Sequence, residues 1–116
     1  YIPARVTGAL FVLAAFLLHF DGRRAWRILR RDAAKHPSPN GGHAEAPVAG
    51  ALGIRLGGKN YYFGEPHFRA YMGEATRDIE ADDIQKTVRL MYTVTVLFLL
   101  IAYGGFLLWQ QRAIFF

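Results

Sequence analysis

The sequence contains no cysteine, so it has no disulfide framework, no thiolate nucleophile and no thiolate metal site. It also lacks the standard phosphate-binding pattern G-x-x-x-x-G-K-[S/T] and the dinucleotide-binding pattern G-x-G-x-x-G. Its nearest approach to the first, GGKN, ends in Asn60 where Ser or Thr is required. Charge is missing from two long stretches, residues 6–20 and residues 90–109, although 20% of all residues are charged. These two charge-free stretches are the strongest structural signal in the sequence.

The second stretch, LMYTVTVLFLLIAYGGFLLW, has the length that a helix needs to cross a bilayer, about 20 apolar residues. Tyr92 and Trp109 stand near its two ends, where amphipathic rings favour the membrane interface. Gly104-Gly105 either allows another helix to approach closely or marks a loose last turn. We predict a transmembrane helix over residues 90–109, followed by a tail over residues 110–116.

The first stretch, VTGALFVLAAFLLHF, is shorter and needs its flanking residues to reach across a bilayer. We predict a transmembrane helix over residues 1–20, with Arg5 reaching the headgroups. The alternative is a buried helix of a soluble core. A secretory signal is disfavoured because basic residues follow the apolar run instead of preceding it. The chain does not begin with Met and starts almost directly on this run, so we expect the C-terminal part of a longer protein.

Residues 21–35 are rich in arginine and predict a basic amphipathic helix, which beside a membrane lies on anionic headgroups. The positive-inside rule then places the region between the two spans in the cytoplasm and both chain ends on the opposite side. Nucleic acid is the other standard partner of a basic helix. It is disfavoured because the basic residues adjoin an apolar segment and the aromatic residues form no base-stacking platform.

Residues 36–75 read as an ordered cytoplasmic loop rich in glycine and proline. Within it we expect a short helix over residues 43–54 that packs through a face of small side chains, with Pro47 in its first turn. An extended segment with a turn at Gly57-Gly58 follows. Residues 76–89 change from acidic to basic, which predicts an amphipathic helix that starts near Ile79 and runs into the second span. The expected fold is an all-α membrane protein with two transmembrane helices flanking a cytoplasmic loop region.

The polar residues of this loop suggest several chemistries without deciding among them. The possible metal ligands match no zinc spacing, although three of them offer a set for Mg²⁺: His36, Asn40 and Glu45. General acid–base catalysis is open to His36, His43 and Glu45. Lys59 fits a non-standard anion-binding backbone nest. The aromatic run 61–63 is either a flat ligand-binding face or a membrane-interface anchor.

The same loop resembles a block in the membrane-bound adenosylcobinamide-phosphate synthases of cobalamin biosynthesis, the CbiB/CobD family. The pieces that carry the resemblance are Arg31-Asp32, HPSPN at 36–40, Glu45 followed by AGALG at 49–53, LGG at 56–58 and YFG at 62–64. PARVTGAL at 3–10 and Asp78-Ile79 also fit. The sequence departs from the family at His43, where many members carry a bulky aromatic residue. Members are longer, multi-pass proteins of the cell inner membrane.

The resemblance implies an ATP-dependent acid–amine ligase that needs Mg²⁺ and takes a corrinoid as its substrate. It would join aminopropanol, or its phosphate, to the propionate of adenosylcobyric acid and give adenosylcobinamide (phosphate). It implies catalytic roles for His36, Asn40 and Glu45, with Asn40 and Glu45 also holding the metal. The implied substrate- and phosphate-binding residues are Arg31, Lys35, Ser38, Lys59, Asn60, Tyr61 and Tyr62.

The expected partners are the lipid bilayer, the remaining N-terminal part of the same protein, and either a second copy or other membrane enzymes of the cobalamin pathway. No nucleic acid is expected. The alternative function is that of a non-catalytic membrane relative that binds a corrinoid or a protein partner.

Overall fold

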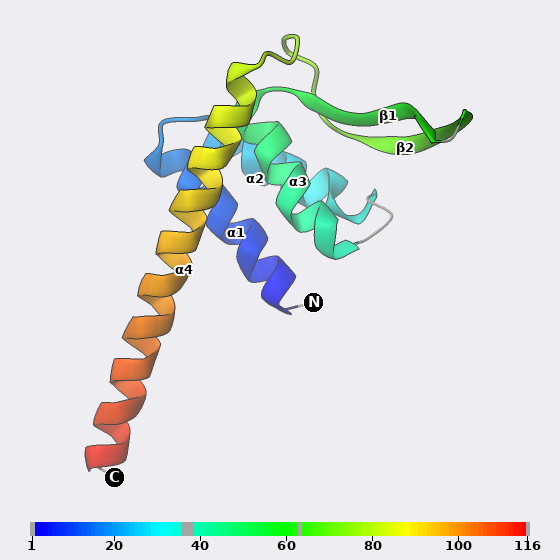
Figure 1. Cartoon of the computed structure of the whole chain (residues 1–116). Coiled ribbons are helices and arrows are strands. Elements are labelled where there is room, and N and C mark those ends of the chain that lie inside the picture. Colours follow the sequence, from blue (N-terminus) through cyan, green and yellow to red (C-terminus); the bar gives the residue numbers. More distant parts are fainter. Residues whose placement is uncertain (1, 36–38, 63, 116) are drawn as a thin grey trace.

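The computed structural model describes residues 2–35, 39–62 and 64–115 (Figure 1). The elements follow one another as α1 (Ile2–Leu17), α2 (Gly22–Asp32), the 3-10 turn η1 (Ala33–Lys35), α3 (Pro39–Leu52), β1 (Arg55–Tyr62), β2 (Glu65–Gly73) and α4 (Asp82–Phe115). The three shorter helices and the first turns of α4 form a head (Figure 1). The β1–β2 hairpin extends from one side of this head, and the C-terminal half of α4 projects from it alone (Figure 1).

The core of the head is built mainly from small side chains, which let the helices approach closely. Ala14, Ala15, Ala25 and Ala46 are fully buried where α1, α2 and α3 meet. A Cβ atom added at Gly50 would lie 2.6 Å from the Arg24 carbonyl oxygen and 2.8 Å from the Cα of Ala25. The expected face of small residues is therefore confirmed, and α2 is the helix that packs against it.

The basic helix is present and is held by a cap at its first residue. The Asp21 side chain accepts a hydrogen bond of 2.9 Å from the Arg24 backbone N–H, which satisfies one of the free donors at the start of α2. Ile28 and Leu29 are buried on its inner side, while its arginines lie largely on the outside. The arrangement agrees with the amphipathic pattern of residues 21–35.

Helix α1 packs against α2, α3 and α4 in the head. It has 16 residues, and Leu10, Phe11 and Val12 on it are buried together with its alanines. The predicted transmembrane helix over residues 1–20 is not confirmed, because α1 has only 16 residues and is shorter than a typical bilayer span. In the described part of the chain, one helix, Asp82–Ala113, is long and apolar enough to cross a membrane by length and composition.

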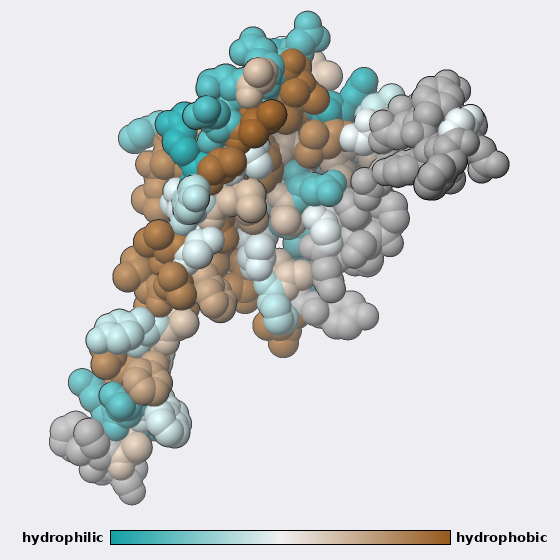
Figure 2. Space-filling model, in the orientation of Figure 1, coloured by the Kyte–Doolittle hydropathy of each residue, from teal (hydrophilic) through white to brown (hydrophobic). Residues whose placement is uncertain are grey.

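Helix α4 presents apolar side chains on all sides over most of its length. Its 34 residues span about 51 Å at 1.5 Å per residue, which accounts for most of the 62 Å length of the molecule. Leu100, Tyr103, Leu108 and Trp109 are each more than 60% exposed. Figure 2 shows the apolar surface continuing from the head onto this helix. The helix also includes residues 110–115, which were expected to form a tail.

The helix that was expected to start near Ile79 starts later, and Arg77 fixes its first turn. Arg77 forms an ion pair with Asp83, with Nη1 3.0 Å from Oδ2, and its Nε donates to the Leu52 carbonyl oxygen at 3.2 Å. The Glu80 backbone N–H donates to Asp83 Oδ2 at 2.7 Å. These bonds join the end of α3 to the first turn of α4, so α4 begins at Asp82.

Helix and strand cover more of residues 36–75 than the sequence pattern predicted. Helix α3 begins at Pro39 rather than at residue 43, so Pro47 lies in its interior and the prediction of a first-turn proline is wrong. The extended segment is one strand of an antiparallel hairpin. Gly57, with φ +97°, lies in a register shift between Leu56 and Gly58 and not in the turn, which comes after Tyr62.

Gly50→Ala tests the close approach of α2 and α3. The new Cβ meets backbone atoms of α2 that cannot move aside, so we expect the variant to lose about 1–3 kcal/mol of unfolding free energy. Gly104→Ala is the control, because no described atom lies within 4 Å of the added Cβ. Thermal unfolding in detergent, followed by far-ultraviolet circular dichroism, compares the two. Equal stability of the two variants would contradict the packing.

Candidate functional site

A buried carboxylate, Asp32, lies where α2, η1 and β2 meet. Its side chain is fully buried. Oδ1 accepts hydrogen bonds from Arg31 Nε at 2.7 Å and from Lys35 Nζ at 3.0 Å. Oδ2 accepts from Arg31 Nη2 at 2.8 Å and from the Gly73 backbone N–H at 2.8 Å. We call Asp32, Arg31 and Lys35 the Asp32 cluster.

The Asp32 cluster carries a net positive charge, because two cations share one carboxylate. Burial alone would raise the pKa of Asp32, but hydrogen bonds from Arg31, Gly73 and Lys35 outweigh burial and hold that pKa below its ordinary value. The hydrogen bond to Asp32 raises the pKa of Arg31. The side chains of Arg31 and Lys35 are 45% and 49% exposed, so both cations can also meet a ligand. The cluster is suited to bind an anionic group such as a phosphate.

Gly73 brings the end of the hairpin to this carboxylate. Its φ of +93° favours glycine, and an added Cβ would collide with the Ile54 carbonyl oxygen and lie 2.8 Å from the Ala49 Cβ. Arg31 Nη2 also donates to the Gly73 carbonyl oxygen at 3.1 Å. Arg31 and Asp32 thus hold both polar backbone groups of Gly73.

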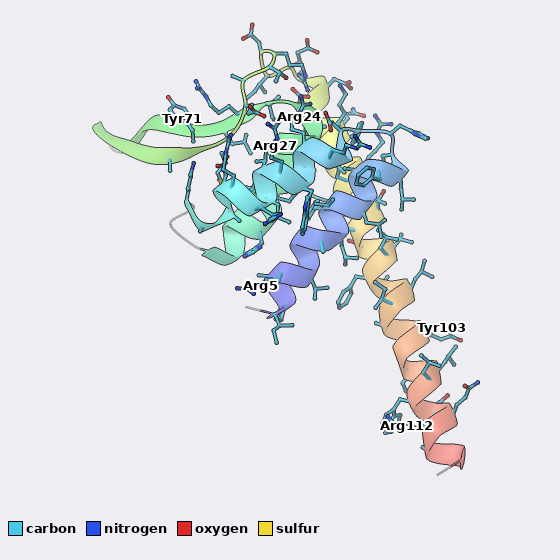
Figure 3. All side chains as sticks on the ribbon, turned by 180° about the vertical axis from the view of Figure 1, so that it is seen from behind. Arg5, Arg24, Arg27, Tyr71, Tyr103 and Arg112 are labelled. Carbon is cyan, nitrogen blue, oxygen red and sulfur yellow. The ribbon has the colours of Figure 1, made fainter. Side chains whose placement is uncertain are left out.

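Two further contacts fix the base of the hairpin. Arg27 on α2 forms an ion pair with Glu74, just after β2. The guanidinium of Arg55 lies 4.0 Å from the centre of the Tyr71 ring, a cation–π distance. Figure 3 shows Arg27 beside the base of the hairpin and Tyr71 on β2. The hairpin therefore leaves the head in a defined direction.

The structure brings together only some of the predicted site residues. Arg31 and Lys35 meet at Asp32, and η1, which contains Lys35, packs against α3, which contains Asn40 and Glu45. Lys59, Asn60, Tyr61 and Tyr62 occupy the outer half of β1, where their backbones pair with residues 65–68 of β2. They are thus on the projecting arm, away from the Asp32 cluster (Figure 1). His36 and Ser38 lie outside the described residues.

The predicted metal site has limited support from α3 itself. Asn40 and Glu45 are five positions apart, which on a helix of 3.6 residues per turn places them about 140° apart around the axis. A single ion held by both would need ligands from other elements as well. Among the described residues, no group of three His, Cys, Asp or Glu side chains is arranged to hold a metal ion. Mg²⁺ binding stays a prediction.

Asp32 itself was missed as a site residue in the sequence. One acidic residue among many arginines reads as a solvated member of a charged helix face. The available signal was its position at the end of α2, with a cation beside it and another three residues later.

Comparisons with known proteins match the chain to one family. The model of one family, described as CobD/Cbib protein, matches residues 1–91. The protein named cobalamin biosynthesis protein CobD in Geobacter metallireducens is 50% identical over 101 residues, which are 87% of this chain and 32% of that protein. Cobalamin biosynthesis protein CbiB of Salmonella typhimurium is 50% identical over 97 residues, 84% of this chain and 30% of that protein.

The CobD protein of Klebsiella pneumoniae is 49% identical over 104 residues, 90% of this chain and 33% of that protein. The chain thus spans about a third of the length of the curated relatives it matches. No solved structure matches it.

Asp32→Asn should destabilise the head strongly, because it leaves Arg31, Lys35 and the Gly73 N–H facing a neutral amide. We expect a loss of about 3 kcal/mol, in the range for breaking a buried ion pair. Asp21→Asn is the matched control at the other end of α2, because asparagine caps a helix about as well as aspartate. Denaturant unfolding in detergent measures both, and similar small losses would show that Asp32 does not hold the fold.

The contribution of Asp32 to the free energy of unfolding should fall at low pH. Its folded-state pKa is depressed below the unfolded value of about 3.9, so its stabilisation is complete well above that value. It is lost as the pH falls through the unfolded and then the folded pKa. The stability difference between the native chain and Asp32→Asn should therefore shrink as the pH is lowered below about 4. Thermal midpoints over a pH series test this, and parallel curves would contradict it.

Proposed function

Because the chain belongs to the CobD/Cbib protein family, we propose that it forms part of a cobalamin-biosynthesis enzyme that joins an amine to a corrinoid carboxylate. The substrates are adenosylcobyric acid and aminopropanol or its phosphate. ATP transfers its γ-phosphoryl group to the propionate oxygen, leaving ADP. The amine nitrogen then attacks the carbonyl carbon, phosphate leaves, and the nitrogen loses a proton to a base. The product is the amide.

The observation that supports this proposal best is the Asp32 cluster. Negative charge develops on the phosphoryl group during its transfer and on the departing phosphate. Fixed cations stabilise this charge. Arg31 and Lys35 are exposed cations whose positions are set by a buried carboxylate, so little reorganisation is needed when an anion binds. In the proposed enzyme they hold the phosphates of ATP or of the amine substrate.

The start of α3 supplies the next groups in the proposed site. A helix beginning at Pro39 presents free backbone N–H groups in its first turn, which favour anions. Asn40 and Glu45 on this helix position the amine and would hold Mg²⁺, His36 accepts the proton, and Ser38 contacts phosphate. Mg²⁺ would neutralise charge on the nucleotide.

The arm formed by the outer hairpin suits a wide substrate. Lys59, Asn60, Tyr61 and Tyr62 lie on β1 beyond the head. We assign them to the corrin ring, which is broad enough to contact the arm while its propionate reaches the Asp32 cluster.

The proposed location is the cytoplasmic face of the cell inner membrane. Helix α4 crosses the bilayer, and the basic residues at its start, Lys86 and Arg89, together with α2, keep the head in the cytoplasm. Multi-pass insertion belongs to this proposal, with further spans in the longer protein. A span formed by residues 1–20 stays a prediction, because α1 packs within the head.

A chimera tests the proposed activity. The matching third of the Salmonella typhimurium CbiB protein is replaced by this chain, and amide formation from adenosylcobyric acid, ATP and each amine is followed by chromatography. We expect turnover by the chimera and a fall of at least about 100-fold in Glu45→Gln and Asn40→Ala, because positioned polar groups contribute about that much or more.

Arg23→Gln is the control for these variants, since Arg23 is exposed on α2 and outside the Asp32 cluster. Full turnover in both variants would show that Asn40 and Glu45 have no catalytic role. A folded, membrane-inserted chimera without any turnover would favour the alternative of a non-catalytic corrinoid-binding relative.

A further inference from the structure

Arginines of two helices line a groove of about 480 Å³ between α1, α2 and the first turns of α3. Arg5 comes from the first turn of α1 (Figure 3) and Arg30 from the last turn of α2, and His43 of α3 lines the same groove. We call it the Arg5–Arg30 groove. Neither Asp32 nor Gly73 lines it, so the groove is separate from the Asp32 cluster.

The helices around the groove approach one another closely at Gly8. A Cβ atom added there would lie 3.0 Å from the His43 carbonyl oxygen and 3.1 Å from the Leu29 Cδ1 atom, so glycine favours this approach. Arg5 precedes Gly8 by three positions and therefore shares its face of α1. The position of Arg5 beside α2 and α3 thus follows from the packing of three helices.

The groove has an excess of positive charge. Among the described residues, Arg5 and Arg30 form no ion pair, and no acidic side chain lines the groove. Arg27 and Arg31, on the same helix as Arg30, are both paired with carboxylates. The Nδ1 atom of His43 is buried without a hydrogen-bond partner among the described residues, and such an atom is normally satisfied by a water or a ligand. These groups favour binding of a phosphate or a carboxylate.

The depth of the groove adds a reason for a bound anion. Pro3 and Val6, which are close to Arg5 in α1, line a second groove together with Val94 and Phe98 of α4. The latter two belong to the apolar run of α4, which crosses the bilayer in the proposed enzyme. A charged side chain at that depth faces the protein interior or a water-filled cavity and pairs with another group. Lipid phosphates lie at the membrane surface instead, so the anion is one that enters the protein.

The groove and the Asp32 cluster lie on neighbouring faces of one helix end. Arg30 lines the groove, and Arg31, the next residue, bonds to Asp32. Consecutive residues of an α-helix point about 100° apart, so the two cation sites stand side by side around the end of α2. Position 40 precedes His43 by three residues and so shares its face of α3, which adjoins the groove. An amine held in the groove through a phosphate would therefore come close to Asn40.

We propose that the Arg5–Arg30 groove binds the phosphate of a small phosphorylated amine, while the Asp32 cluster binds the phosphates of ATP. The assignment rests on the proposed function, in which both molecules are substrates. A phosphate monoester needs only cations and hydrogen-bond donors. ATP is accompanied by Mg²⁺, for which the described lining of the groove has no carboxylate. Leu29 and Ala33 in this lining give the short carbon chain of the amine an apolar wall.

Kinetics of the chimera with each amine test the assignment. Arg5→Gln and Arg30→Gln should each raise the KM for aminopropanol phosphate about tenfold, the effect of losing a hydrogen bond to a charged group. The KM values for free aminopropanol and for ATP should not change, because neither places a phosphate in the groove. Arg23→Gln is the matched control, because it removes the same charge from an exposed position of α2 outside the groove, and it should change none of these values.

Calorimetric titration of the chimera with aminopropanol phosphate, without ATP, gives a readout that needs no turnover. Binding should be saturable and about tenfold weaker in Arg5→Gln and Arg30→Gln, but not in Arg23→Gln, with circular dichroism confirming that each variant is folded. If the chimera binds in this way yet forms no amide, the proposed function fails and the assignment of the groove stands.

Three results would overturn the assignment of the groove while leaving the proposed function intact. The first is turnover in which Arg5→Gln affects both amines, or ATP, equally. The second is turnover with free aminopropanol alone. The third is unchanged binding of aminopropanol phosphate in Arg5→Gln and Arg30→Gln, because other groups of the longer protein would then neutralise the two arginines. Absence of saturable binding to the chimera overturns the assignment whether or not the amide forms.

Discussion

The buried carboxylate of Asp32 is the interaction on which the arrangement of the head depends. It is fully buried and remains ionised only because Arg31, Lys35 and the Gly73 N–H all donate to it. Those partners come from the end of α2, from η1 and from the end of β2. One ionised group therefore decides where the hairpin leaves the head and where two exposed cations stand.

Two helices of the fold followed from the composition and periodicity of the sequence. The uncharged run from Leu90 predicted α4, and the arginine-rich segment after Asp21 predicted α2, because both signals are local and strong. The role of α1 was harder to predict, since a short apolar helix fits a membrane and a packed head equally well. The interior position of Pro47 and the bulge at Gly57 depend on tertiary contacts that no local pattern records.

The candidate site was predictable only in part for similar reasons. The resemblance predicted that Arg31 and Lys35 bind phosphate, and the structure brings these two side chains together at Asp32. It did not show that β1 carries Lys59 to Tyr62 onto an arm beyond the head, because sequence proximity to the other motifs gives no distance in space. Asp32 was part of the resemblance but was given no role, because its burial depends on Gly73, 41 positions away.

Arg77 joins helices α3 and α4. Its guanidinium binds both the last carbonyl of α3 and the first turn of α4, and Thr76 bonds to the Gly53 carbonyl beside it through its hydroxyl at 2.6 Å. Helix α4 is thus bonded at its first turn to α3, the helix that carries Asn40 and Glu45. Because these bonds join the two helices at one end, a change in the direction of α4 would also shift the end of α3.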